Sequence, residues 1–201
     1  PSQLLAFDTA QLNALTSRQI AVLTTAQISA LDPDALAALS TAQYVAMTTT
    51  QLAALTLSQA AALQSADVAA LSTAQIRAIE NTNIAALSGE AIAGLTTTQV
   101  AALRTDQLAA LTDDQLLSLE SRDVAALTTG QLASLDVSQL QVLDTAQLAA
   151  LTTRQVAALT TQQLAAIDPD KLAAALGTEE FAALTTAQVA SLTVEQAAAM
   201  Q

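Results

Sequence analysis

The sequence predicts an all-α solenoid of short helices, in which each eight-residue repeat supplies one capped helix and one corner. Three observations lead to this fold class. A phrase close to L-T-T-x-Q-[LVI]-A-A recurs every eight residues, as in 143–166, LDTAQLAALTTRQVAALTTQQLAA. Each phrase carries its own helix start signal. Its two large apolar positions are separated alternately by five and three residues, a spacing that no straight helix or strand keeps on one face.

The repeat, here called the octad, runs through the whole chain. We number each octad from its large apolar residue, so that position 1 falls on Phe7 and then every eight residues as far as Ile167. One extra residue enters within 173–176, and Leu176 resumes the phase. The sequence therefore predicts one continuous array over 1–201. Because it begins and ends within an octad and lacks the polar caps typical of solenoid ends, we expect it to be a segment of a longer array.

Each octad contains the signal for a helix N-terminus. Thr, Ser or Asp at position 2 and Gln at position 5 form a capping box, and the apolar residues at positions 1 and 6 form a hydrophobic staple. Pro33 and Pro169 fall at position 3, the first helical residue, where a missing N–H costs nothing. Some octads lack part of this signal, and each missing cap lowers the stability of the helix by about 1 kcal/mol. Position 2 carries a poor cap at Gln64, Glu80, Arg104 and Glu120, and position 5 is alanine at Ala35 and Ala91.

The apolar spacing places a corner inside every octad. Position 6 and the next position 1 lie about 60° apart on a helix, whereas position 1 and the following position 6 lie about 140° apart. The chain must therefore bend between positions 1 and 6. Isolated helices of about six residues do not persist in water, so neighbouring helices must stack.

The composition of each position predicts which side faces the core. Positions 1 and 6 line a narrow core, and we expect the three aromatic residues, Phe7, Tyr44 and Phe181, to belong to it. Position 8 accepts only small residues or valine, which indicates close contact between helices. All 18 acidic residues and every basic residue except Arg77 occupy positions 2 to 5, so we expect these positions to form the solvated face.

Charge and composition exclude several classes of function. The net charge of −12 argues against binding nucleic acid. No run of 18 apolar residues is present, so we expect no membrane insertion. Histidine and cysteine are absent, which removes the common nucleophile–base pairs, disulfides and transition-metal sites. We predict that the protein is not an enzyme and needs no cofactor.

Two groups of residues suggest binding sites. The acidic pairs are candidates for cation binding, but none lies in a glycine-rich calcium loop, and we interpret them as solvated residues at helix N-termini. These pairs are Asp113–Asp114, Asp32 with Asp34, Asp168 with Asp170, and Glu179–Glu180. The threonines at positions 2 and 3 suggest a hydroxyl lattice that would bind ice or glycans, although position 3 also admits Leu57 and Val137. We predict no catalytic, cofactor-binding or metal site.

The phrase LTTAQ[LVI]AA, as in 23–28 and 184–189, resembles the Ala/Leu/Thr/Gln-rich tandem repeats of very large proteobacterial proteins. Those proteins are described as adhesin-, hemagglutinin-, RTX- or haem-utilisation-like. The resemblance covers the whole chain and implies an extracellular stalk or surface-fibre segment. The chain carries neither the RTX calcium nonapeptide nor a His- or Tyr-rich haem site.

These observations favour a structural segment, a stalk, spacer or filament-forming solenoid, of a bacterial surface or secreted protein. The expected partners are neighbouring repeats of the same polypeptide or other copies of the chain, associated end to end or laterally. The alternative is a binding or adhesion module that uses its acidic, Thr-rich face for a protein, glycan, mineral or ice surface.

Overall fold

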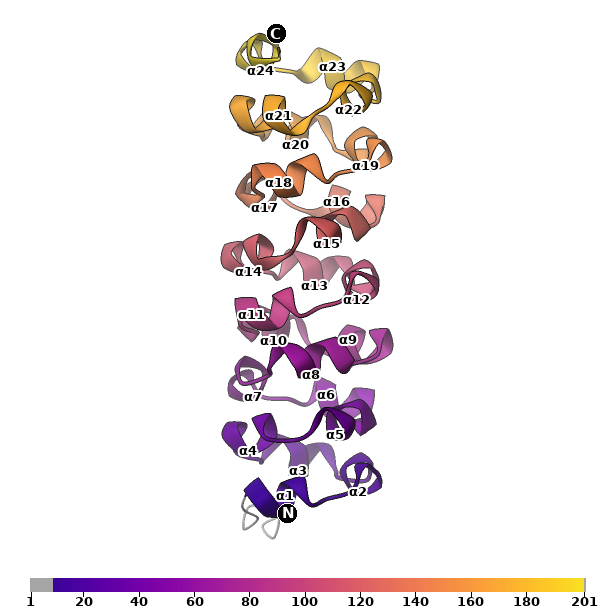
Figure 1. Cartoon of the computed structure of the whole chain (residues 1–201), viewed down its shortest axis with the longest axis vertical. Helices are drawn as coiled ribbons and strands as arrows, with labels where there is room; N and C mark the ends of the chain where they lie inside the picture. Colours follow the sequence, from indigo (N-terminus) through magenta and orange to yellow (C-terminus); the bar gives the residue numbers. More distant parts are fainter. Residues whose placement is uncertain (1–8, 201) are drawn as a thin grey trace. The chain divides into compact units, whose positions relative to one another are not determined.

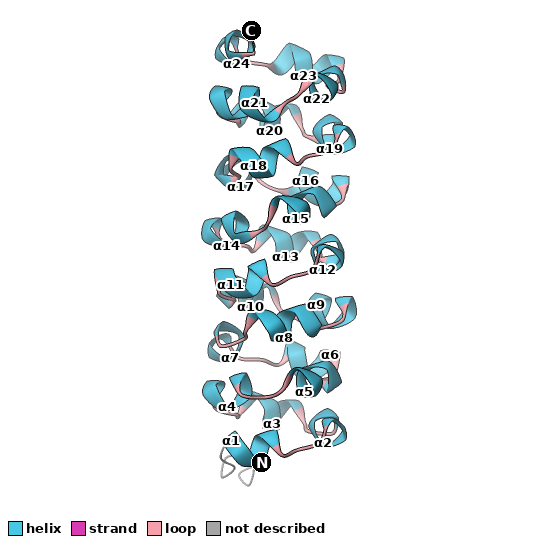
Figure 2. Ribbon diagram, in the orientation of Figure 1, coloured by secondary structure: helices cyan, strands magenta, loops and turns pink. Residues whose placement is uncertain are grey.

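A computed structural model of the chain describes residues 9–200. Over these residues the protein consists of 24 short α-helices without a strand (Figures 1 and 2). The all-α solenoid prediction is confirmed. The helices are α1 (Thr9–Asn13), α2 (Ser17–Ala21), α3 (Thr25–Ser29), α4 (Pro33–Ala37), α5 (Thr41–Ala46), α6 (Thr49–Ala53), α7 (Leu57–Ala61), α8 (Ser65–Ala70), α9 (Thr73–Ala78), α10 (Asn81–Ala86), α11 (Gly89–Ala93), α12 (Thr97–Ala102), α13 (Thr105–Ala109), α14 (Asp113–Ser118), α15 (Ser121–Ala126), α16 (Thr129–Ser134), α17 (Val137–Val142), α18 (Thr145–Ala149), α19 (Thr153–Ala158), α20 (Thr161–Ala166), α21 (Pro169–Ala175), α22 (Thr178–Ala182), α23 (Thr186–Ser191) and α24 (Val194–Ala199).

The chain divides into two compact units, residues 1–103 and 104–201, and the division falls in the corner between α12 and α13. Within each unit, every helix packs against the helix three places later, for example α6 against α9 and α18 against α21. Each turn of the stack therefore holds about three helices. The continuity of the array across both units stays a prediction from the sequence.

The corners that follow the six-residue helices are each made by two residues with extended backbone angles. Between α19 and α20, Leu159 has φ −58° and ψ 138°, and Thr160 has φ −68° and ψ 155°. No described residue has a positive φ, so the corners do not require glycine. This backbone explains how the chain turns every eight residues with only four glycines.

The helix starts follow the predicted capping chemistry. In α20 the Thr160 hydroxyl accepts from the backbone N–H of Gln163, and the Gln163 side chain accepts from the Thr160 N–H. The same reciprocal pair recurs in most octads, and Pro33 and Pro169 occupy the first helical residue as expected. Gln64 and Glu80 provide no side-chain cap.

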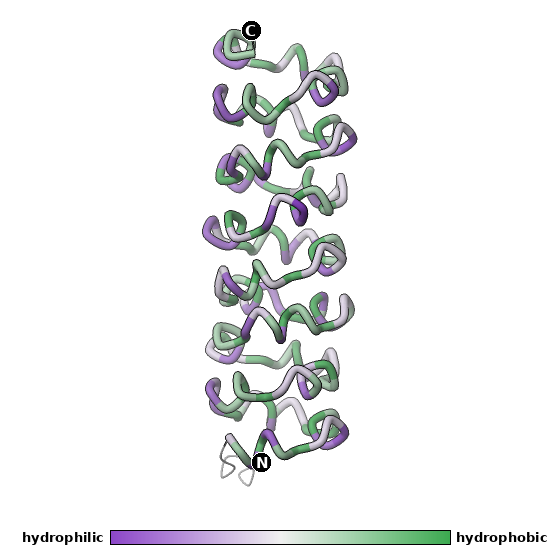
Figure 3. The backbone as a smooth tube through the Cα atoms, in the orientation of Figure 1, coloured by the Kyte–Doolittle hydropathy of each residue, from purple (hydrophilic) through white to green (hydrophobic). Residues whose placement is uncertain are grey.

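The core follows positions 1 and 6. Position-6 side chains from Leu12 to Leu172 are at most 3% exposed, and position-1 side chains from Leu31 to Ile167 at most 5%. Figure 3 shows that hydrophilic stretches recur along the path between hydrophobic ones. Tyr44 is fully buried, as predicted. Phe7 lies outside the described residues.

Position 8 packs closely where its smallest residue occurs. A Cβ added to Gly94 would lie 2.7 Å from the Cβ and carbonyl oxygen of Ser65, at the start of the helix one turn earlier. Such a distance leaves no room for a side chain. At Gly94 the predicted close contact between helices is therefore present.

Candidate functional site: a buried glutamine ladder

The prominent polar feature of the protein is a row of buried glutamines at position 5, here called the glutamine ladder. Each side-chain amide donates from Nε2 to backbone carbonyls of the preceding turn. These carbonyls lie 28 and 31 residues earlier in the sequence, or 29 and 32 residues earlier for Gln188 and Gln196. The ladder comprises Gln43, Gln51, Gln59, Gln75 and Gln99 in the first unit and Gln139, Gln147, Gln155, Gln163, Gln188 and Gln196 in the second. These side chains are at most 6% exposed.

Gln163 shows how one side chain joins two turns. Its Oε1 accepts from the Thr160 N–H at 2.8 Å, and its Nε2 donates to the carbonyls of Leu132 and Leu135 at 3.0 and 2.7 Å. Leu132 belongs to the last turn of α16, and Leu135 is the corner residue that follows. The carbonyls at a helix C-terminus have no partner within their own helix. One amide therefore satisfies the N-terminus of one helix and the C-terminus of another.

The predicted insertion shifts the ladder by one residue. The extra residue falls within α21, which has seven residues instead of five or six. Gln188 and Gln196 then donate to carbonyls 29 and 32 residues earlier, at 2.8–2.9 Å. The ladder thus resumes after α22 with its geometry preserved.

Two other residue types at position 5 keep the donation. The Nδ2 of Asn83 donates to the Leu55 carbonyl at 2.7 Å. The Nζ of Lys171 donates to the carbonyls of Gln141 and Leu143 at 3.1 and 3.2 Å. The carbonyls of the ladder therefore accept an ammonium group as well as an amide.

The expectation that positions 2 to 5 form a solvated face is wrong for position 5. Asp67 and Asp123 occupy this position and are buried, 5% and 0% exposed. The side chain at position 5 points toward the preceding turn because it is the third residue of a helix whose N-terminus stacks on the earlier corner. The pKa of both carboxyl groups is raised, because burial is the larger effect. The hydrogen bond from a backbone N–H three residues earlier acts in the opposite direction and lowers the pKa by less.

In the first unit, a tyrosine replaces the donor that Asp67 lacks. The ladder register would place a glutamine at position 67 against the carbonyls of Leu36 and Leu39. An ionised carboxylate has no proton to donate. The hydroxyl of Tyr44 instead donates to the Leu36 carbonyl at 2.7 Å. Burial, and secondly the charge of Asp67, raise the pKa of Tyr44 above its usual range, so the phenol keeps this proton.

Asp123 is less well satisfied. Its Oδ2 accepts from the Glu120 N–H at 3.2 Å, whereas its Oδ1 is buried without a hydrogen-bond partner. An unsatisfied buried oxygen costs about 1–3 kcal/mol. This carboxylate is therefore a weak point of the second unit at neutral pH.

The acidic pairs are N-terminal residues of separate helices. Asp32 and Asp168 are N-caps that accept from the N–H groups of Asp34 and Asp170. Asp113–Asp114 and Glu179–Glu180 lie in the first turns of α14 and α22. Across residues 9–200, no three acidic residues gather where they could hold a metal ion.

The threonines at position 2 are already engaged. Their hydroxyls accept the backbone N–H of position 5, and those of Thr96 and Thr152 also donate to the Gln Oε1 of their own octad at 3.0 and 2.9 Å. These bonds hold each hydroxyl against its own helix. A hydroxyl lattice that binds ice or glycans would therefore depend mainly on the threonines at position 3.

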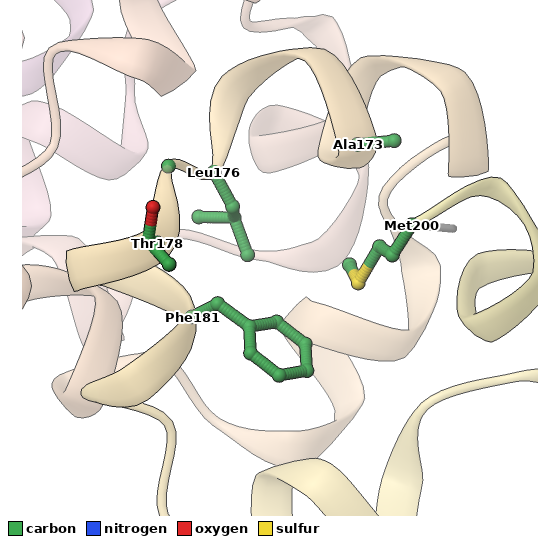
Figure 4. A pocket seen from close by; sticks show the side chains of 6 residues that line it. Ala173, Leu176, Thr178, Phe181 and Met200 are labelled. Carbon is green, nitrogen blue, oxygen red and sulfur yellow. The ribbon is translucent and has the colours of Figure 1, made fainter.

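The irregular octad after the insertion forms an apolar pocket in the second unit. The pocket has a volume of about 280 Å³, and Figure 4 shows the side chains of Leu176, Phe181 and Met200 around it. The prediction that Phe181 belongs to the core is wrong, because its side chain is 43% exposed. Glu180 stands at the ladder position of α22, where a carboxylate cannot donate, and α22 buries none of its residues.

Sequence reasoning found the capping glutamines but missed their second bond. The signal was present: in about three quarters of the octads position 5 is a residue with a side-chain amide, although a cap needs only an acceptor there.

No helix within the described range is both long and apolar enough to cross a membrane.

The comparison with known families agrees with the octad. The profile of the ALTTAQ repeat matches seven overlapping segments that together cover residues 1–174. The chain belongs to the ALTTAQ repeat family. A search of curated proteins finds no match. The family and the helical solenoid indicate a structural repeat protein and suggest a non-enzymatic role.

Proposed function

We propose that this ALTTAQ repeat chain is a stalk, spacer or filament-forming segment of a bacterial surface or secreted protein. The observation that carries the proposal is the uniformity of the glutamine ladder. The same two bonds join successive turns in both units, at 2.6–3.4 Å. A stack built from one repeated junction extends by adding octads and needs no single globular core.

The distribution of charge supports a spacer. The exposed acidic residues occur from Asp32 to Glu195, each near the start of its own helix, and they complement the helix dipoles. A net charge of −12 makes the exposed surfaces of neighbouring molecules repel each other and favours solubility. The partners that this role implies are further repeats of the same polypeptide or other copies of the chain.

The first test is to find where the protein lies in the cells that produce it. Immunogold labelling of intact and of permeabilised cells, with an antibody raised against this chain, separates surface from internal protein. Labelling of intact cells supports the proposal. Labelling that requires permeabilisation contradicts the surface assignment, unless the protein is recovered from the medium.

The second test distinguishes the structural roles from the binding alternative. Cryo-electron microscopy and light scattering of the purified chain show whether it assembles, and ordered fibres would establish a filament. Discrete particles favour a stalk or spacer. Saturable binding to a glycan array, or inhibition of ice recrystallisation, would instead favour a binding module that uses the Thr-rich face.

A further inference from the structure

One rung of the glutamine ladder, meaning one position-5 side chain with the carbonyls that it faces, is incomplete at Asp67. A glutamine at this position would donate to two carbonyls, those of Leu36 and Leu39. The Tyr44 hydroxyl serves the Leu36 carbonyl at 2.7 Å. Within the described residues, no donor reaches the carbonyl of Leu39, a residue that is only 4% exposed. One hydrogen-bond donor is therefore missing from this rung.

Asn83 shows how far a short side chain at position 5 reaches. Its Nδ2 donates at 2.7 Å to the Leu55 carbonyl, 28 residues earlier. The carbonyl 28 residues before Asp67 is that of Leu39. Aspartate and asparagine have the same length, and both side chains are buried, 5% and 4% exposed. The example of Asn83 therefore places a carboxyl oxygen of Asp67 within hydrogen-bond reach of the Leu39 oxygen.

This buried cluster has more acceptors than hydrogens. The Asp67 carboxyl accepts from the Gln64 N–H, and an ionised carboxyl group has no hydrogen of its own. The hydrogen of the Tyr44 hydroxyl is already directed at the Leu36 carbonyl. An ionised Asp67 thus leaves two buried oxygens facing each other without a hydrogen between them, which costs free energy. A single proton on Asp67 would turn one of these acceptors into a donor.

No basic side chain on the helices packed against α8 balances the charge of Asp67. α8 packs against α5 and α11. The titratable side chains of these two helices are Tyr44 and the exposed Glu90. The nearest basic residue along the chain, Arg77 of α9, donates to the Ala102 carbonyl at 2.9 Å. Burial without a cationic partner favours the protonated carboxyl group, in the direction in which the pKa of Asp67 is raised.

We propose that Asp67 is a proton-operated rung of the ladder. At acidic pH its carboxyl group takes up a proton and donates it to the Leu39 carbonyl, while Tyr44 continues to serve Leu36. The two side chains together then supply the two donors of a glutamine. When the proton leaves, the junction between α5 and α8 loses one hydrogen bond. The first unit therefore contains a junction between turns that is strengthened by acid.

The test is an NMR pH titration of the ¹³C,¹⁵N-labelled full chain. The side-chain carboxyl carbon of Asp67 reports its protonation, and the backbone carbonyl carbon of Leu39, read through the Ser40 amide, reports the hydrogen bond. We expect both signals to follow one midpoint, above the value of about 3.9 for an unperturbed aspartate. The Leu36 carbonyl signal should move much less. A midpoint at or below about 3.9, or a Leu39 signal that does not follow Asp67, would overturn the proposal.

Asp67→Asn provides the matched control, because its amide carries a donor at every pH. Its Leu39 carbonyl signal should stay near the position that the parent chain reaches in acid. A Leu39 signal that titrates in this variant as it does in the parent chain would refute the assignment. Asn83→Asp makes the reciprocal change and should create a new titration that the Leu55 carbonyl signal follows. A Leu55 signal that ignores the new carboxyl group would contradict the geometry, whether or not Asp67→Asn folds.

Urea unfolding tests the effect on stability. At pH 7 the unfolding equilibrium constant of the parent chain should exceed that of Asp67→Asn by at least about several-fold. Because the pKa of Asp67 is raised in the folded protein, the parent chain gains stability relative to the variant as the pH falls through that pKa. It gains nothing more below the pKa of Asp67 in the unfolded chain, about 3.9. A ratio that is the same at pH 7 and near about pH 4 would show that the rung does not respond to protons.

Discussion

Replacing Gln163 by alanine tests whether the glutamine ladder holds the turns together. The substitution removes three hydrogen bonds, of 2.8, 3.0 and 2.7 Å. At a net value of about 1 kcal/mol each they contribute about 3 kcal/mol, and the buried carbonyls left without a donor add a desolvation cost. We expect the free energy of unfolding to fall by about 3–5 kcal/mol.

The adjacent residue provides the control. Gln162 lies in the same helix and is exposed, so Gln162→Ala makes the same chemical change without touching the ladder. Urea unfolding followed by circular dichroism at 222 nm compares both variants with the parent chain. A loss of cooperativity in Gln163→Ala would also agree with the reasoning, because neighbouring turns would be uncoupled. If the unfolding free energies of the two variants lay within about 0.5 kcal/mol of each other, the ladder would not stabilise the stack.

Four further predictions use the same urea assay. Gly94→Ala should lower the unfolding free energy by about 1–3 kcal/mol, since its Cβ would overlap Ser65. Gly130→Ala, with no atom within 4 Å of the new Cβ, should raise it by about 0.5–1 kcal/mol. Asp123→Asn should stabilise the protein at pH 7. Burial raises the pKa of Asp123 in the folded protein. Ionisation of Asp123 therefore lowers the free energy of unfolding at pH values above this pKa, and has no effect at pH values below the pKa of Asp123 in the unfolded chain. The stabilisation by Asp123→Asn should thus shrink as the pH is lowered toward about 4. Tyr44→Phe should cost about 1–2 kcal/mol by removing a 2.7 Å bond to a buried carbonyl, and an unchanged midpoint would show that this bond is not needed.

The corrected expectations share one physical cause. The burial of Asp67 and Asp123 and the exposure of Phe181 were all missed because helical periodicity describes a residue only within its own octad. Whether the third residue of a helix faces water depends on what lies beneath that helix. For Phe181, the insertion and the loss of a ladder donor at Glu180 leave α22 with no buried residue.

The sequence alone determined the local structure of this protein. The period of eight, the capping box, the proline positions and the apolar pair at positions 1 and 6 set one short helix and one corner per octad, since these signals act within a few residues. Only the tertiary structure decided how many helices complete a turn and what the glutamines do. Their Nε2 atoms reach carbonyls 28 and 31 residues away, and such a partner exists only after the chain has completed a turn.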